Sequence, residues 1–95
     1  MPQSLARVLV HLVFSTKNRE PSIGRDTRPQ LHEYLGGILN TLGCSPLRVG
    51  GTADHVHALF SLARTRTIAE VVEEAKTASS KWMKHQGSRD FWWQA

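Results

Sequence analysis

The histidines His55 and His57 are separated by one residue, Val56, in a segment whose apolar residues alternate. Alternate residues of a β-strand share a face, so both imidazoles would point the same way, with Cα atoms about 6.7 Å apart. At that spacing two imidazoles can approach one metal ion at about 2.1 Å each. Two solvated imidazoles on a half-exposed strand fit the same pattern, so the pair by itself leaves metal binding open.

The residues around the pair predict the strand that carries it. Val56, Ala58 and Phe60 form an apolar face opposite the histidines, within a strand over residues 55–62. A second strand is expected over residues 47–49, on the other side of a glycine-rich loop. The histidines would then lie on a rigid base, which favours a defined site.

The first strand is predicted over residues 7–15. Both of its alternating sets are largely apolar, which is typical of a strand covered on both faces and therefore central in its sheet. His11 lies in this segment, and we expect it to be a hydrogen-bonded core residue and not a ligand. The polar segment 16–27 that follows is expected to be a loop.

Two amphipathic helices are predicted, over residues 29–42 and 67–85, because apolar residues recur there with a period near 3.6. Thr67 and Glu70 form the capping-box pattern at the start of the second helix.

Several other residues carry packing expectations. Gly36 and Gly37 lie inside the first helix, which suggests that another backbone passes close to it. Tyr34 flanks the apolar stripe of this helix and is expected at the edge of the core. Trp92 and Trp93 are adjacent and cannot both face one core, so one of them either stacks on a base or is covered by another subunit.

With a short last strand near residues 91–93, the order of elements is β-α-β-β-α-β. This order predicts an α+β, ferredoxin-like fold: a four-stranded antiparallel sheet with two helices on one face. A chain of 95 residues has the length of one domain, so we assign residues 1–95 to a single domain.

Composition narrows the functional classes. The chain carries 12 Lys and Arg against 8 Asp and Glu, a net charge of +4 that points weakly to an anionic partner. The single cysteine, Cys44, excludes an internal disulfide and an all-thiolate metal site. No apolar run approaches the roughly 20 residues of a membrane span, and the N-terminal residues lack a signal core, so we expect a cytoplasmic protein with no membrane partner.

Four segments, spread over the whole chain, resemble one family. They are residues 54–57 on the internal strand, 11–17 on the first strand, 79–82 on the second helix and 91–95 at the end. In this order they are similar to the single-tyrosine HUH transposases of small bacterial insertion sequences, a group that includes the REP-associated tyrosine transposases.

The resemblance implies DNA transposition by metal-dependent cleavage and rejoining of single-stranded DNA. It implies that His55 and His57 hold Mg²⁺ or Mn²⁺, and that a tyrosine forms a 5′-phosphotyrosine link with the cut strand. It also implies recognition of hairpins in single-stranded DNA and assembly into a homodimer.

The sequence departs from the family at the nucleophile. In the family, the catalytic tyrosine opens a helix directly after the strand that residues 91–94 resemble, and this sequence ends at Ala95. Its single tyrosine, Tyr34, belongs to the first helix. We therefore expect a transposase domain that lacks its nucleophile and does not cleave DNA. The alternative is a non-catalytic ferredoxin-like module that binds DNA or a small ligand.

Five basic residues are candidates for contacts with DNA phosphates, and plain solvated surface charge is the equal alternative for each. They are Lys17, Arg19, Arg48, Arg64 and Arg66. Dimerisation is expected to cover the exposed edge of the small sheet and the apolar residues 91–93.

Overall fold

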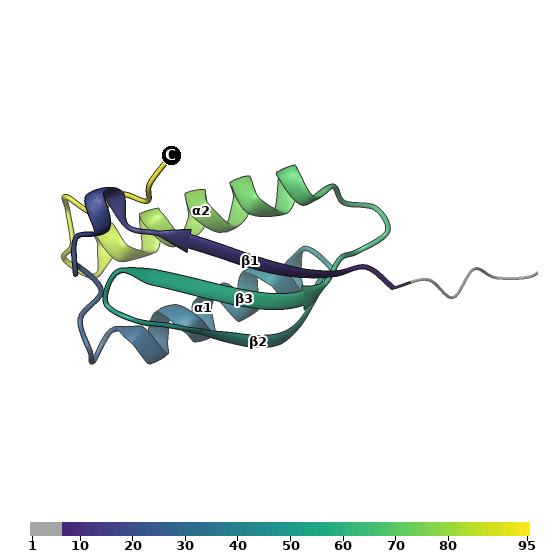
Figure 1. The fold of residues 1–95 in the computed structure, drawn as a ribbon, viewed down its shortest axis with the longest axis horizontal. Helices are drawn as coiled ribbons and strands as arrows, with labels where there is room; N and C mark the ends of the chain where they lie inside the picture. Colours follow the sequence, from purple (N-terminus) through teal and green to yellow (C-terminus); the bar gives the residue numbers. More distant parts are fainter. Residues whose placement is uncertain (1–6) are drawn as a thin grey trace, which may run out of the picture.

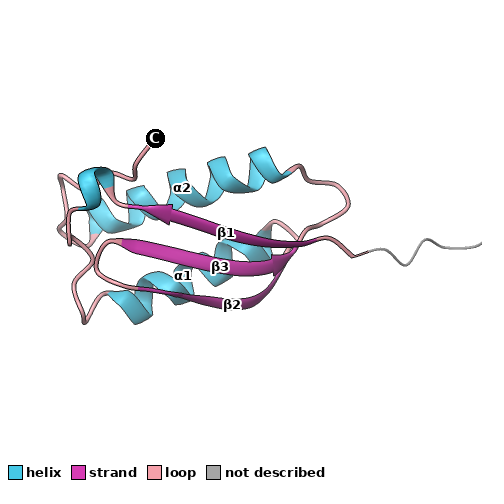
Figure 2. Cartoon of the chain, viewed as in Figure 1, coloured by secondary structure: helices cyan, strands magenta, loops and turns pink. Residues whose placement is uncertain are grey.

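Three antiparallel strands form one layer of the molecule, and two helices pack against one face of it (Figures 1 and 2). The computed structural model describes residues 7–95. Its elements are β1 (Leu9–Ser15), the short 3-10 helix η1 (Lys17–Arg19), α1 (Arg28–Thr41), β2 (Ser45–Gly51), β3 (His55–Ser61) and α2 (Ile68–His85). The predicted α+β, ferredoxin-like arrangement is confirmed.

The strand order is β1-β3-β2, so β3 occupies the centre of the sheet. The prediction that residues 7–15 form the central strand is wrong. β1 pairs with β3 along one edge. At its other edge the only pairing among the described residues is an isolated bridge between Thr16, which directly follows β1, and Trp93. The expected short fourth strand is reduced to this bridge in the described part of the chain.

The outward face of β1 explains the error. Leu9 is 54% exposed and Val13 is 58% exposed, so one of the two apolar sets of this strand is not covered by the chain itself. An alternating apolar pattern reports which residues share a face, but it does not report what lies over that face.

The core lies between the sheet and the helices. On the sheet side, Phe14 of β1 and Val56, Ala58 and Phe60 of β3 are buried. Leucines at helical spacing on α1 and small or apolar residues on α2 meet them from the other layer, as the apolar stripes predicted. These residues are Leu31, Leu35, Leu39, Val71, Ala75, Ser79 and Met83.

The predicted capping box at the start of α2 is confirmed. The amide of Glu70 donates to Oγ1 of Thr67 at 3.1 Å, and the amide of Thr67 donates to Oε1 of Glu70 at 3.3 Å. These two bonds satisfy donors that a helix start would otherwise leave to solvent.

The expectation that a backbone passes close to Gly36 and Gly37 is wrong. A Cβ placed on either glycine would meet no atom within 4 Å. Gly37 instead lines a groove of about 740 Å³ between α1 and α2. Tyr34 and Trp82 stack in this groove with ring centroids 5.5 Å apart, so Tyr34 lies at the edge of the core as predicted.

The two adjacent tryptophans point into different environments. Trp93 is 8% exposed and packs edge-on against Phe14 and Phe91, with centroids 4.5 and 4.7 Å away. Its Nε1–H donates to Oγ of Ser79 at 3.0 Å. Trp92 is 57% exposed. Phe91 and Trp93 therefore need no second subunit to cover them, contrary to the expectation for residues 91–93.

Within residues 7–95, neither helix combines the length and the apolar character that crossing a bilayer would require.

Candidate metal and DNA-binding site

The two histidines of β3 lie on the face of the sheet that points away from the helices, which we call the open face. The burial of β3 alternates strictly, with Val56 and Ala58 buried and both His55 and His57 partly exposed. The shared face that the sequence predicted is therefore confirmed. The imidazole centroids are 6.4 Å apart, and the ring planes are inclined by 33°.

His55 is held by the turn that precedes β3. Its Nδ1 lies 3.0 Å from Oδ1 of Asp54 and 2.9 Å from Oγ1 of Thr52. Because a carboxylate only accepts hydrogen bonds, we assign the ring proton to Nδ1, which leaves the lone pair of Nε2 available to a ligand. The carboxylate thereby fixes both the tautomer and the orientation of the ring, as partners behind metal-binding histidines do.

Asp54 is stabilised as a carboxylate by this network. The hydrogen bond from His55 is the main cause that lowers the pKa of Asp54, and bonds from Thr52 and Arg19 lower it further. Nε of Arg19 lies 3.3 Å from Oδ2 of Asp54. The network therefore favours the charged form of Asp54.

The η1 turn brings Arg19 to Asp54 in an unusual backbone conformation. Both Asn18 and Arg19 have φ near 56°, a region that costs non-glycine residues about 1–3 kcal/mol. The amide of Asn18 donates to Oε1 of Gln94 at 3.0 Å, which helps to hold the turn. Such a conformation persists only where surrounding contacts enforce it, and here it directs a guanidinium at the carboxylate behind His55.

His57 lies over a glycine of the neighbouring strand. Gly50 on β2 is paired with His57, and a Cβ at Gly50 would lie 3.0 Å from both Cε1 and Nε2 of the ring. The missing side chain therefore makes room for the imidazole. Gly51 is equally constrained, because a Cβ there would lie 2.3 Å from the carbonyl oxygen of His55. The glycine-rich loop thus shapes the environment of both histidines.

His11 also lies on the open face, and the expectation that it belongs to the core is wrong. Its side chain is exposed, and its ring meets that of His57 edge-on with centroids 5.9 Å apart. The error follows from the same cause as the misplaced central strand, since the odd-numbered residues of β1 face outward.

The donor set suits a weakly held cation. Two imidazoles share one face, and one of them has its tautomer fixed by a carboxylate. No group of three or more His, Cys, Asp or Glu side chains among residues 7–95 is arranged to hold an ion. A cation at His55 and His57 would therefore take its other ligands from water or from a bound phosphate.

The chain is similar to a known family of proteins. Residues 4–95 match the protein family described as "Transposase IS200 like". The chain belongs to the IS200-like transposase family. A search of curated proteins found no match.

Among solved structures, this IS200-like domain is similar to a "putative transposase" from Deinococcus radiodurans R1, with 23% sequence identity and a TM-score of 0.80. The similarity covers 87% of this chain and 64% of the other, so this chain spans less than two thirds of that protein. At this identity the likeness establishes a shared fold.

The five basic residues predicted to contact DNA fall into three places on the IS200-like domain. Lys17 and Arg19 lie in η1, beside the Asp54 end of the sheet. Arg48 is exposed on β2, where it pairs with Leu59 and so shares the open face with the histidines. Arg64 and Arg66 follow β3 at the opposite end of the sheet (Figure 1), where NH1 of Arg66 lies 3.8 Å from Oε2 of Glu70. They do not form one patch.

Tyr34 lies in the helical layer of the domain, in the groove between α1 and α2. The histidine pair lies on the other side of the sheet. The only tyrosine of the sequence is therefore separated from the candidate metal site by the sheet itself.

Sequence reasoning missed three residues around the site. Thr52 and Gly50 belong to the glycine-rich loop, whose position just before the histidines was the available signal. His32 on α1 has its Nε2 buried without a hydrogen-bond partner among the described residues. Burial lowers the pKa of His32, and His57 and Arg28 lower it further. Its position next to the buried Leu31 was the only hint in the sequence.

Proposed function

We propose that this IS200-like transposase domain binds hairpin-forming single-stranded DNA, with His55 and His57 holding Mg²⁺ or Mn²⁺ against a phosphate of the strand. The observation that carries the proposal is the pair of imidazoles on the open face with the Asp54 carboxylate fixed behind one of them. A structural role would not need two histidines at alternate positions facing solvent.

The chain's own residues prepare the site for a phosphate. Asp54 keeps Nε2 of His55 free to bind, and Gly50 leaves space for the ring of His57. Arg48 and His11 lie on the same face as the pair. Lys17 lies in η1 with Arg19, whose side chain contacts Asp54. When bound, a divalent cation would withdraw charge from the phosphate oxygens. The positively charged side chains of Arg48 and Lys17 would attract and orient the DNA strand.

We propose that the family reaction is cleavage and rejoining through a 5′-phosphotyrosine. In that reaction a tyrosine oxygen forms a bond to phosphorus, the bond from phosphorus to the 3′ oxygen breaks, and the 3′ hydroxyl receives the proton. Tyr34 stacks on Trp82 on the far side of the sheet and does not face the histidines. We therefore propose that these 95 residues bind DNA and the cation without forming the covalent link.

We further propose that the domain works as a homodimer in the cytoplasm, where its DNA is found. Within residues 7–95, the outer edge of β1 carries only the bridge between Thr16 and Trp93, so most of its backbone donors and acceptors are unpaired. A strand edge of this kind is a ready site for pairing with another chain.

Metal binding tests the proposal directly. Titration with Mn²⁺, followed by the relaxation of water protons, should show weak binding to the wild-type chain. His57→Ala and His55→Ala should each remove most of it. His85→Ala, at the exposed end of α2, is the matched control and should leave it unchanged. Equal affinity in all four proteins would disprove the metal site.

Covalent capture tests the proposed lack of cleavage. A hairpin oligonucleotide from the DNA flanking the gene should be retarded by the protein. A denaturing gel with Mn²⁺ present should show no covalent adduct. An adduct that Tyr34→Phe abolishes would show that Tyr34 is the nucleophile. The conclusion that Tyr34 does not reach the histidines would then be wrong.

A further inference from the structure

Trp92 is an exposed indole on a rigid support. The amide of Lys17 donates to the carbonyl oxygen of Trp92 at 2.9 Å, which ties the backbone to the end of β1. The neighbours Phe91 and Trp93 are 2% and 8% exposed, whereas Trp92 is 57% exposed. Phe91 and Trp93 therefore anchor this segment in the core, and Trp92 faces the solvent. Exposed, rigidly held indoles are common in binding surfaces.

The surface beside Trp92 is basic. Nζ of Lys84 lies 3.7 Å above the centre of the Trp92 ring, in a cation–π contact. Lys84, Lys81 and Lys76 line a hollow of about 310 Å³ next to this ring, together with the hydroxyl residues Thr77 and Ser80. Its lining, all within the described residues, contains no carboxylate.

The spacing on α2 arranges these lysines along the helix. Lys76, Ser80 and Lys84 follow one another at intervals of four residues and so share one face of α2. The row is about 12 Å long at 1.5 Å per residue. Positive charge is thus spread along a line, which suits a chain of phosphates better than a single compact anion.

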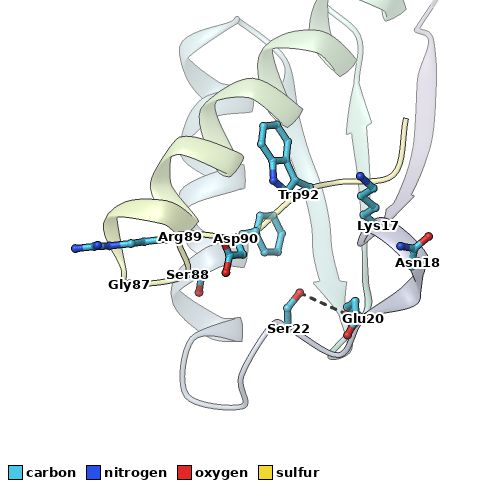
Figure 3. Close-up of a pocket in the computed structure, with 10 residues that line it drawn as sticks. Lys17, Asn18, Glu20, Ser22, Gly87, Ser88, Arg89, Asp90 and Trp92 are labelled. Atoms are coloured by element: carbon cyan, nitrogen blue, oxygen red, sulfur yellow. Dashed lines mark hydrogen bonds between the residues drawn. The ribbon is translucent and has the colours of Figure 1, made fainter.

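Trp92 also borders a second hollow, of about 510 Å³. Figure 3 shows its ring beside α2, with Lys17 on one side of the hollow and Arg89 at the turn after α2. Glu20 and Asp90 contribute carboxylates to this second hollow, so its charge is mixed. The lysine-lined hollow is therefore the better binder of phosphates.

The backbone of this surface lies near that of the histidine pair. Trp93 bridges to Thr16, and the preceding residue Ser15 pairs with His55. β1 alone lies between the two backbones, so two strand spacings, about 10 Å, separate them. The lysines belong to α2 in the helical layer and the histidines point from the open face, so a single strand of DNA that contacts both would pass around the outer edge of β1.

We propose that Trp92, Lys76, Lys81 and Lys84 form a binding subsite for single-stranded DNA, in which a base stacks on the indole and the lysines contact phosphates. This inference rests on the proposed function, because it takes single-stranded DNA as the ligand. The combination of an exposed aromatic ring with a line of cations is how proteins bind single strands without reading their sequence.

The first test uses a fluorescein-labelled oligonucleotide of about twelve thymidines, which forms no hairpin, with anisotropy as the readout. Trp92→Ala should weaken binding roughly 5- to 150-fold, the range for loss of one base–aromatic stack. Trp92→Phe keeps a ring and should weaken binding less. Trp82→Phe is the matched control, because Trp82 stacks on Tyr34 in the groove between the helices, and it should bind as the wild type does.

Charge is tested through the salt dependence. Lys81→Gln and Lys84→Gln should each reduce the slope of log affinity against log salt by about 0.7. Arg25→Gln, in the exposed loop before α1, removes the same charge elsewhere and should leave the slope unchanged. A thermal melt of each variant confirms that it is folded.

Tryptophan emission gives a second, independent measurement. The oligonucleotide should quench the emission of the wild-type protein, and Trp92→Phe should abolish that quenching. Wild-type affinity in Trp92→Ala, or quenching that persists in Trp92→Phe, would overturn the subsite. Competition by polyglutamate as effective as competition by unlabelled oligonucleotide would also overturn it, since the surface would then bind any polyanion.

Measurements in EDTA separate this inference from the proposed metal site. The loss caused by Trp92→Ala and the quenching should both persist without a divalent cation, because the contact between Trp92 and a base involves none. If the wild type binds Mn²⁺ but Trp92→Ala does not affect binding of the oligonucleotide, the subsite fails and the metal site stands. If Mn²⁺ does not bind while Trp92→Ala weakens the oligonucleotide complex, the metal site fails and the subsite stands.

Discussion

Nδ1 of His55 lies 3.0 Å from Oδ1 of Asp54, the residue immediately before it. The turn before β3 therefore supplies the group that orients the first histidine of the strand. The same carboxylate receives Arg19 from η1, so three segments of the chain meet behind one imidazole.

Replacing Asp54 should weaken metal binding without unfolding the domain. Loss of a partner behind a metal-binding histidine typically costs 10- to 100-fold in affinity, roughly, and we expect Asp54→Ala to fall in that range for Mn²⁺. Asp54→Asn retains an acceptor oxygen and should lose less. Asp26→Ala, in the loop before α1, serves as the control. Wild-type affinity in Asp54→Ala would show that the carboxylate does not orient the ring.

A methyl group at position 50 should displace His57. A Cβ at Gly50 would lie 3.0 Å from Nε2 of the ring, so the imidazole must move by a few tenths of an ångström. Gly50→Ala should shift the NMR signals of His57 and reduce Mn²⁺ affinity. Gly36→Ala meets no atom within 4 Å and lies inside α1. It should instead raise the free energy of unfolding by about 0.4–1 kcal/mol. Unchanged His57 signals in Gly50→Ala would contradict the assigned contact.

Ser79 anchors the end of the chain to α2. Trp93 donates its Nε1–H to Oγ of Ser79 at 3.0 Å, and both side chains are buried. Ser79→Ala leaves that donor without a partner, so the free energy of unfolding should fall by about 1–3 kcal/mol in urea denaturation. Ser80→Ala, on a neighbouring position of the same helix, is the control. A loss in Ser79→Ala no larger than that in Ser80→Ala would show that the bond is not formed.

His32 should make the domain less stable in acid. Burial is the main cause that lowers the pKa of His32 below its ordinary value of 6.5, so the unfolded chain binds a proton more readily than the folded chain. The free energy of unfolding should therefore fall as the pH drops through 6.5 and below. His32→Leu should reduce this dependence. An NMR titration that places the pKa of His32 at or above 6.5 would refute the expectation.

The outer edge of β1 should mediate dimerisation, because among the described residues it carries only the bridge between Thr16 and Trp93. The carbonyl oxygen of Ser15 points to this edge, where it accepts from the amide of Gln94, and Val13 lies two residues earlier on the same side of the strand. Proline on a strand edge blocks pairing with another chain. Sedimentation of the wild type at micromolar concentration should show a dimer, and Val13→Pro should show a monomer. Leu47→Lys, at a residue of β2 that is 52% exposed, should leave the dimer intact. A monomeric wild type would reject the dimer, and a monomeric Leu47→Lys would move its interface to β2.

Patterns within single elements were sufficient to predict much of this domain. The alternation from Val56 to Phe60 placed both histidines on one face, because side-chain direction in a strand depends only on the parity of the position. The helical period of Leu31, Leu35 and Leu39 and the capping box at Thr67 located the helices for equally local reasons. The four segments that resemble a transposase family, among them residues 54–57, pointed to the family to which the chain belongs.

What the sequence could not decide depended on contacts between elements. The alternation in β1 was the same whether its outer face was covered or open, so the exposure of His11 and the edge position of the strand were set by the pairing with β3. Whether Gly36 or Gly50 has a close neighbour depends on which element lies opposite, and only Gly50 faces an imidazole. Trp92 and Trp93 differ by one position, but only Trp93 reaches Ser79, because the bridge to Thr16 fixes which ring turns into the core.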